Sequence, residues 1–128
     1  MITIELLHET IAGEPGPNFY FRGSPNNYLD FVIALHPLGE YDGFNIVLND
    51  SIGINNRTNK KITFSSAPEG KALCLLKDSE IVVELPHQKW CSVLNYIFTI
   101  TFYPSTQYIE FDDLDLIEDA NFIVESIR

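Results

Sequence analysis

The chain is short of positive charge. Its 128 residues include 8 Lys and Arg against 18 Asp and Glu, which gives a formal net charge of −10. Nucleic-acid binding depends on neutralising phosphates with a surplus of Lys and Arg, and docking on anionic lipid depends on similar basic clusters. The composition therefore argues against a nucleic-acid partner and against attachment to a membrane.

Targeting and membrane-spanning segments are also lacking. The chain starts Met-Ile-Thr-Ile-Glu, without the basic leader and apolar stretch of a signal peptide. The longest run without a charged residue, 90–109, contains Pro104 and several polar side chains, so we expect a buried helix and a turn there instead of a membrane span. Cys74 and Cys91 are too few for a disulfide framework. We therefore expect a cytoplasmic protein.

Motifs that bind cofactors or carry out catalysis are scarce. The 7 glycines are scattered, so the sequence has no phosphate-binding loop, and it has no Gly-x-Ser-x-Gly nucleophile motif. Asp113 and Asp115 resemble the start of a calcium-binding loop, but Ile117 and Glu118 stand where the next ligand and the glycine are required. We expect no cofactor, no metal and no enzymatic activity.

His87 and Cys91 are the one pair of residues that suggests chemistry. They are four residues apart and would share one face of a helix, where they could contribute to a zinc site or form a Cys–His nucleophile pair. A zinc site would need Cys74 and a distant histidine to converge on them. The favoured alternative is a cysteine in the core and a histidine at the surface.

The first part of the chain predicts two strands and a helix. Residues 2–7 alternate between apolar and polar, which is typical of a half-buried strand, and 18–22 form a second strand. Ser24 is a good N-cap and Pro25 fits the first helical position, while Pro37 and Gly39 are expected to end the helix. Tyr20 should point away from the core, where it is either an exposed contact or covered by the preceding loop.

The rest of the chain predicts six more strands and a second helix. Pro86 is expected to open the helix, which could give way to a strand near Phe98. The expected strands are 44–48, 61–65, 72–76, 81–85, 108–111 and 121–127, with 72–85 forming a hairpin and 49–59 a loop or a wide hairpin connection. Leu29 and Val32 should belong to the core.

These elements indicate a single α+β domain over residues 1–128. We expect two layers, with a largely antiparallel sheet carrying two helices on one face. The order of elements also suggests a pseudo-repeat of two ββαββ halves, since a shift of 61 places Pro25 on Pro86 and Leu29 on Trp90. Few positions are identical, so chance similarity is the competing explanation.

The acids are concentrated near the C-terminus. Residues 90–127 contain seven acids and no Lys or Arg, whereas five bases and a single acid lie between Arg57 and Lys77. Solubility is the simplest explanation, and a docking surface for a basic protein is the functional one. The candidate binding residues are Tyr108, Glu110, Asp112, Asp113, Asp115, Glu118 and Asp119, with Tyr108 as an aromatic anchor.

Three functional hypotheses follow from the sequence. The first is a non-enzymatic protein-binding module, such as an inhibitor or immunity-type protein that neutralises a basic effector, for example a nuclease toxin. The second is a self-associating protein, a homodimer in which the basic stretch of one copy meets the acidic region of another. The third is a small enzyme whose site is assembled from dispersed residues, with His87 and Cys91 or the carboxylates taking part.

Overall fold

The described residues form two helices and ten strands, which confirms the predicted α+β class. The computed structural model describes residues 1–11, 13–49, 52–67, 72–100, 102, 107–110, 117–118 and 120–127, with the backbone alone at 107–110 and 117–118. The elements in order are β1 (Ile2–Leu7), β2 (Asn18–Gly23), α1 (Pro25–Glu40), β3 (Asn45–Val47), β4 (Ile54–Asn56), β5 (Lys61–Ala67), β6 (Leu73–Leu76), β7 (Glu80–Pro86), α2 (His87–Ile100), β8 (Gln107–Glu110), β9 (Ile117–Glu118) and β10 (Asn121–Ser126).

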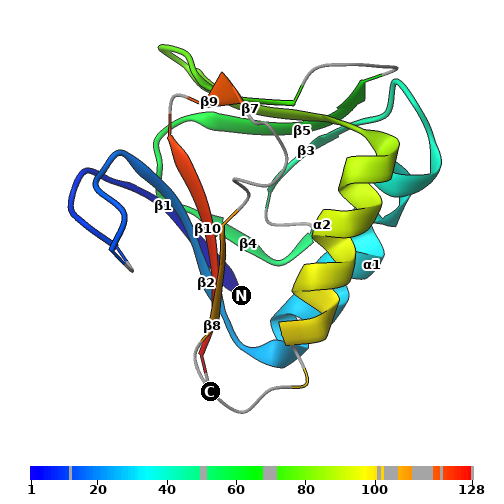
Figure 1. The fold of residues 1–128 in the computed structure, drawn as a ribbon, viewed down its shortest axis with the longest axis horizontal. Helices are drawn as coiled ribbons and strands as arrows, with labels where there is room; N and C mark the ends of the chain where they lie inside the picture. The colour runs from blue at the N-terminus through cyan, green and yellow to red at the C-terminus, as the bar shows by residue number, and fades with distance from the viewer. Residues whose placement is uncertain are drawn as a thin grey trace.

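The strands form two sheets instead of the single sheet expected from the sequence. Sheet I has the order β4-β1-β2-β10-β8, and sheet II has the order β3-β5-β7-β6-β9. Within the described residues, four strand pairs are antiparallel and four are parallel, so neither sheet is largely antiparallel. In Figure 1 the two sheets and the pair of helices form three walls around the interior.

The two sheets share one topology. Strands β4, β1, β2, β10 and β8 of sheet I correspond to β9, β6, β7, β5 and β3 of sheet II. The order of sheet I therefore matches the order of sheet II read from its other edge. The directions also agree, because β1–β2 and β6–β7 are antiparallel hairpins, while β2–β10 and β5–β7 are parallel pairs. The chain thus consists of two topologically equivalent halves, each ββαβββ and one strand longer than the predicted ββαββ.

Each half exchanges strands with the other. The first half supplies β1, β2 and β4 to sheet I but places β3 and β5 in sheet II, and the second half does the reverse with β8 and β10. Asn121 pairs with Asn18 in sheet I, and Lys61 pairs with Glu80 in sheet II. Neither sheet can be completed by one half of the chain.

Helix α1 begins as the sequence predicts. Ser24 is the N-cap, and its hydroxyl accepts a hydrogen bond from the Asn27 amide N–H at 3.4 Å. The Asn27 side chain accepts the Ser24 amide N–H in return at 3.2 Å, which completes a capping box, and Pro25 occupies the first turn.

The predicted end of α1 at Pro37 and Gly39 is wrong, since the helix continues to Glu40. Pro37 removes a hydrogen bond to the Ile33 carbonyl on the exposed side of the helix, where water can replace it. Gly39 serves helix packing, because a Cβ atom there would lie 2.9 Å from the Cys91 sulfur of α2. The small residue lets the two helices approach closely.

The buried faces of the helices are related by a constant offset. The inward residues of α1 are Tyr28, Phe31, Leu35 and Leu38, and those of α2 are Trp90, Val93, Ile97 and Ile100, each 62 positions later. The offset of 61 taken from the sequence is therefore one residue short. A common origin of the two halves stays a prediction.

Equivalent hydrogen bonds fasten each helix to a strand from the other half. The Tyr28 hydroxyl donates to the Glu125 carbonyl in β10 at 2.6 Å, and the Trp90 indole N–H donates to the Ser65 carbonyl in β5 at 2.7 Å. Both rings are buried, so the polar atom of each side chain is satisfied by main chain.

Aromatic rings fill the space between the sheets. Phe21 and Phe122 of sheet I stack with their ring centroids 5.0 Å apart, and Phe64 of sheet II lies 6.0 Å from Phe21. Trp90 packs on Phe64 at 5.0 Å, which joins α2 to the same cluster. Buried residues of both sheets and both helices belong to one hydrophobic core.

The structure corrects the expected burial of two α1 residues and the expected secondary structure of residues 49–59. Leu29 and Val32 are only partly buried, because the inward stripe of α1 runs through Tyr28 and Phe31. The stretch 49–59, expected to be a loop or wide hairpin connection, contains β4, which pairs in parallel with β1. Tyr20 is buried, so it is not an exposed contact, and its cover by the preceding loop stays a prediction. Among the described helices, none is long and apolar enough to cross a membrane.

Leu35→Ala should lower the free energy of unfolding by about 2–5 kcal/mol, because the side chain is fully buried and truncation leaves a cavity. Leu29→Ala, at a partly buried position of the same helix, should cost only about 1 kcal/mol. Urea denaturation of both variants measures the difference. Equal losses would contradict the assignment of the inward face.

Tyr28→Phe should lower the free energy of unfolding by about 1 kcal/mol, because it removes the bond to the Glu125 carbonyl and keeps the ring. Tyr96→Phe makes the same chemical change on an exposed part of α2 and should alter stability by no more than about 0.5 kcal/mol. Thermal denaturation of the two variants tests this bond, and an unchanged Tyr28→Phe protein counts against it.

Candidate functional site

Two regions qualify as candidate sites: the acidic segment, residues 108–119, and the outer side of the helix pair. Tyr108 and Glu110 lie on β8, which closes one edge of sheet I, while Glu118 lies on β9, which closes one edge of sheet II. Asp112, Asp113, Asp115 and Asp119 lie outside the described residues. The segment therefore begins on an edge strand of one sheet and ends on an edge strand of the other.

The backbone register locates the ends of the acidic segment. Tyr108 pairs with Glu125 and Glu110 pairs with Ile123 in the antiparallel ladder between β8 and β10. Glu118 pairs with Cys74 in the parallel ladder between β9 and β6. The first end of the segment thus pairs with β10 of sheet I, and the last end pairs with β6 of sheet II.

Glu125 is the seventh acid of the C-terminal third, and it lies on β10 outside the acidic segment. Partial burial raises the pKa of its carboxyl group above the ordinary value. Burial also raises the pKa of the Tyr28 phenol, which donates to the Glu125 carbonyl. Because Trp90 makes the equivalent bond in the other half with a group that does not titrate, this contact has a structural role.

His87 and Cys91 connect α2 to α1 and to the turn that follows it. The His87 Nδ1 atom lies 2.7 Å from a carboxylate oxygen of Asp42, and the Cys91 sulfur donates to the Gly39 carbonyl at 3.1 Å. Cys91 is exposed, so the expectation of a core cysteine is wrong. The inward positions of this part of α2 belong to Trp90 and Val93, which leaves Cys91 on the side facing α1.

The residues considered for a metal site are dispersed. Cys74 is buried on β6, whereas His8 is exposed before β2 and His36 is exposed on α1. Within the part of the chain that the structure describes, no group of three or more His, Cys, Asp or Glu side chains is arranged to hold a metal ion. The contacts described for His87 and Cys91 are hydrogen bonds to Asp42 and to the Gly39 carbonyl.

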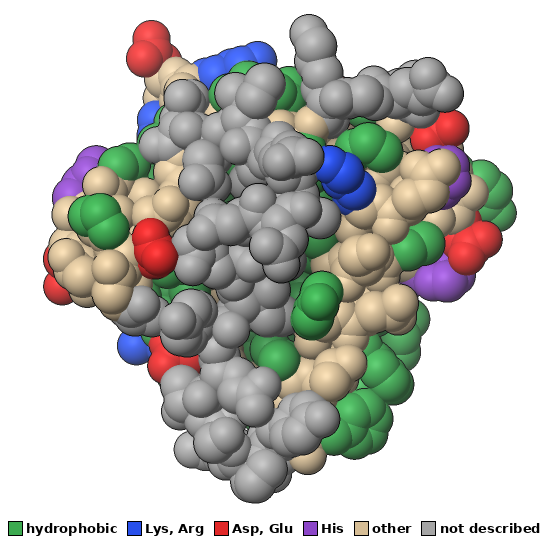
Figure 2. Space-filling model, viewed as in Figure 1, with side chains coloured by type: hydrophobic (Ala, Val, Ile, Leu, Met, Phe, Trp, Pro, Cys, Tyr) green, Lys and Arg blue, Asp and Glu red, His purple; other side chains and the backbone are tan. Residues whose placement is uncertain are grey.

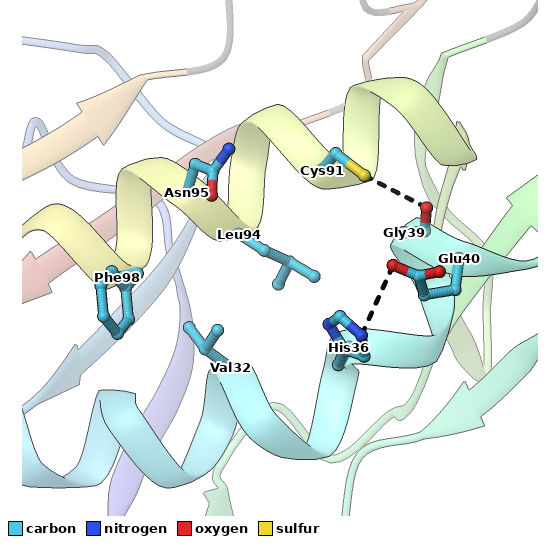
Figure 3. Close-up of a pocket in the computed structure, with 8 residues that line it drawn as sticks. All are labelled: Val32, His36, Gly39, Glu40, Cys91, Leu94, Asn95 and Phe98. Atoms are coloured by element: carbon cyan, nitrogen blue, oxygen red, sulfur yellow. Dashed lines mark hydrogen bonds and ion pairs between the residues drawn. The ribbon is translucent and has the colours of Figure 1, made fainter.

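A groove runs between the outer sides of α1 and α2. It has a volume of about 390 Å³ and is lined by Val32, His36, Gly39, Glu40, Cys91, Leu94, Asn95 and Phe98. Figure 3 shows Val32 opposite Phe98 at one end and Gly39 opposite Cys91 at the other, so the two helices run antiparallel. Sequence reasoning missed this groove, which we call the helix groove.

The side chains of the helix groove differ between its two ends. Beside the Val32 end, Phe98 is 43% exposed and Phe102 is 65% exposed, and their rings meet edge to face at 5.1 Å. At the Gly39 end, the His36 ring lies 3.5 Å from the Glu40 carboxylate. Figure 2 shows hydrophobic side chains at the lower right of the molecule and acidic and histidine side chains at the upper right, on the side where the helices lie.

Glu125→Gln should raise the melting temperature at pH 7.5 and have no effect near pH 4. Folding raises the carboxyl pKa, so the folded state disfavours the charged form, and the glutamate loses stability as the pH rises through the raised pKa. Glutamine keeps the shape without the charge. Glu9→Gln, on an exposed loop, is the control and should show no such gain. A gain that persists at pH 4 would contradict this account.

Comparisons with protein-family models, curated protein sequences and solved structures find no match to this chain. Its function must therefore be argued from its own residues.

Proposed function

We propose that this chain is a non-enzymatic, protein-binding module of the cytoplasm. Its partner is a basic protein, and the specific role is that of an inhibitor or immunity-type protein that neutralises a basic effector such as a nuclease toxin. The observation that carries the proposal is the distribution of charge, since residues 90–127 hold seven acids and no Lys or Arg. This distribution is what a basic partner would recognise.

The placement of the acidic segment supports a binding role. Its ends belong to β8 and β9, which are terminal strands of two different sheets. The described ends of the segment thus lie at one edge of each sheet. Its carboxylates would occupy the positively charged site of an effector in place of nucleic-acid phosphate.

The carboxylates and an aromatic residue would contribute to binding in different ways. The carboxylates would speed encounter with a basic protein and disfavour acidic partners, which affects association rate and specificity more than affinity. Tyr108 would supply the affinity as an aromatic anchor of the kind that dominates interface energetics. It stands at the β8 end of the acidic segment, two residues before Glu110.

Self-association is less well supported, because part of the basic stretch is used within the molecule. The Lys60 ammonium group donates to the main-chain carbonyls of Lys77 and Asp78 at 2.7 and 2.9 Å. Lys61 lies 3.8 Å from the Glu80 carboxylate. These contacts reduce the charge that the stretch between Arg57 and Lys77 could offer to the acidic segment of another copy.

Replacing Asp112, Asp113 and Asp115 together by Asn should slow association with the basic partner about tenfold or more at low salt. The candidate partner to be mixed with the chain is the basic protein encoded by the adjacent gene, and stopped-flow fluorescence measures the rate. Raising the ionic strength should slow the unmodified chain in the same way.

The matched control replaces Glu9, Asp30 and Asp78, which are exposed acids on other parts of the surface, by Gln, Asn and Asn. It removes the same net charge and should change the rate by much less. Association that is insensitive to salt, or equally sensitive to both triple substitutions, argues against the acidic segment. A dimer of the chain that dissociates in salt would favour self-association instead.

A further inference from the structure

We propose that the helix groove is a second docking site, which takes an amphipathic helix of a partner protein. The basic end of that helix would lie beside Glu40 and Asp42, and its apolar residues would lie against Val32, Ile33 and Phe98. This site uses residues other than the acidic segment, and it does not depend on the function proposed above.

The first observation is apolar surface beyond the needs of the core. Ile33 is 72% exposed on α1, Phe98 is 43% exposed on α2, and Phe102, which follows α2, is 65% exposed. Ile33 is three residues before His36 and seven before Glu40, so by helical spacing it lies beside these two residues, which line the helix groove. Exposed large hydrophobic side chains that gather beside a groove are typical of protein-binding surfaces.

The second observation is the charge at the other end of the helix groove. Glu40 ends α1 and Asp42 follows two residues later, and both side chains are exposed. The partners described for them are the imidazoles of His36 and His87, and none of the residues described as lining the groove is Lys or Arg. Because the helices run antiparallel, their dipoles oppose one another. The carboxylates therefore decide the sign of the electrostatic potential at this end of the groove. Lys or Arg of a partner would complement this end.

The shape of the helix groove favours a helix as the occupant. The lining residues form two stripes, 32–40 on α1 and 91–98 on α2, at three- and four-residue spacing. At 1.5 Å per residue each stripe extends about 10–12 Å along its helix axis, which is the length of about two helical turns. An amphipathic helix in such a groove places anchors at i, i+3 or i+4, and i+7. Because one end of the groove is apolar and the other is acidic, the bound helix would have its basic residues at the acidic end.

A second copy of this chain is a poorer occupant. Its formal charge of −10 would bring more acid to the end of the groove that already holds Glu40 and Asp42. The apolar part of the groove is also small, whereas a stable dimer buries about 800 Å² on each partner. A basic partner helix satisfies both ends of the groove.

The probe for the test is a fluorescein-labelled amphipathic peptide of about four turns, with leucines at three- and four-residue spacing and lysines in its last turn. Fluorescence anisotropy measures its binding to the full chain. Ile33→Asp and Phe98→Asp should each weaken binding at least about tenfold, because each places a charge against the leucines. Circular dichroism of each variant checks that the fold is kept.

The matched control is Tyr96→Asp. Tyr96 is 60% exposed on α2 but is two residues before Phe98, so it faces another side of the helix. This variant should bind the probe as the unmodified chain does. A peptide with glutamates in place of the lysines should bind at least about tenfold more weakly, and Glu40→Gln should reduce that preference.

The acidic segment separates this proposal from the previous one. Replacing Asp112, Asp113 and Asp115 by Asn should leave peptide binding unchanged. The proposal is overturned if the lysine peptide fails to bind, if its binding survives Ile33→Asp and Phe98→Asp, or if it is lost with the three Asp→Asn changes. Sedimentation of the chain as a dimer that Ile33→Asp dissociates would assign the groove to a second copy instead.

Discussion

Two buried hydrogen bonds, from Tyr28 to the Glu125 carbonyl and from Trp90 to the Ser65 carbonyl, depend on an exchange of strands between the halves of the chain. Each helix is fastened to a strand that the other half supplies. The same exchange brings Phe122 from the second half beside Phe21 in sheet I, and it brings Phe64 into the space between the sheets. The core forms only when both halves are in place.

The equivalence of the halves ends at the molecular surface. On the inward faces of the helices, buried residues occupy matching positions 62 apart. On the outward faces the same offset pairs Ile33 with Asn95 and His36 with Phe98. The core constrains the inward positions to apolar residues, whereas the outward positions are free to differ. The helix groove thus has unlike ends on a symmetric scaffold, and a symmetric groove could not orient a partner.

Local signals in the sequence predicted local structure well. The Ser24 cap, the hairpin of β6 and β7 and the alternation in β1 each depend on neighbouring residues, so a single sequence reveals them. The division into two sheets depends on pairings such as that of Asn18 with Asn121, which no local pattern encodes. β4 was missed because it is three residues long and polar in two of them, and it is a strand only because β1 lies beside it. The acidic segment could be found by counting charges, but the helix groove needs two helices about sixty residues apart. The excess of apolar residues on α1 beyond one core-facing stripe, Ile33 above all, was the signal available for it.

The exchange of strands also sets when the chain can fold. Sheet I needs β10, whose residues end at Ser126, and sheet II needs β9, which ends at Glu118. During synthesis, sheet II cannot be completed before β9 has left the ribosome, and sheet I cannot be completed before β10 has. Until then the aromatic strand β2 has β1 beside it on one edge and lacks β10 on the other. Long-range pairing of this kind slows folding and leaves strand edges unprotected in the meantime. The arrangement that makes the finished core continuous therefore makes folding of the nascent chain dependent on β9 and β10.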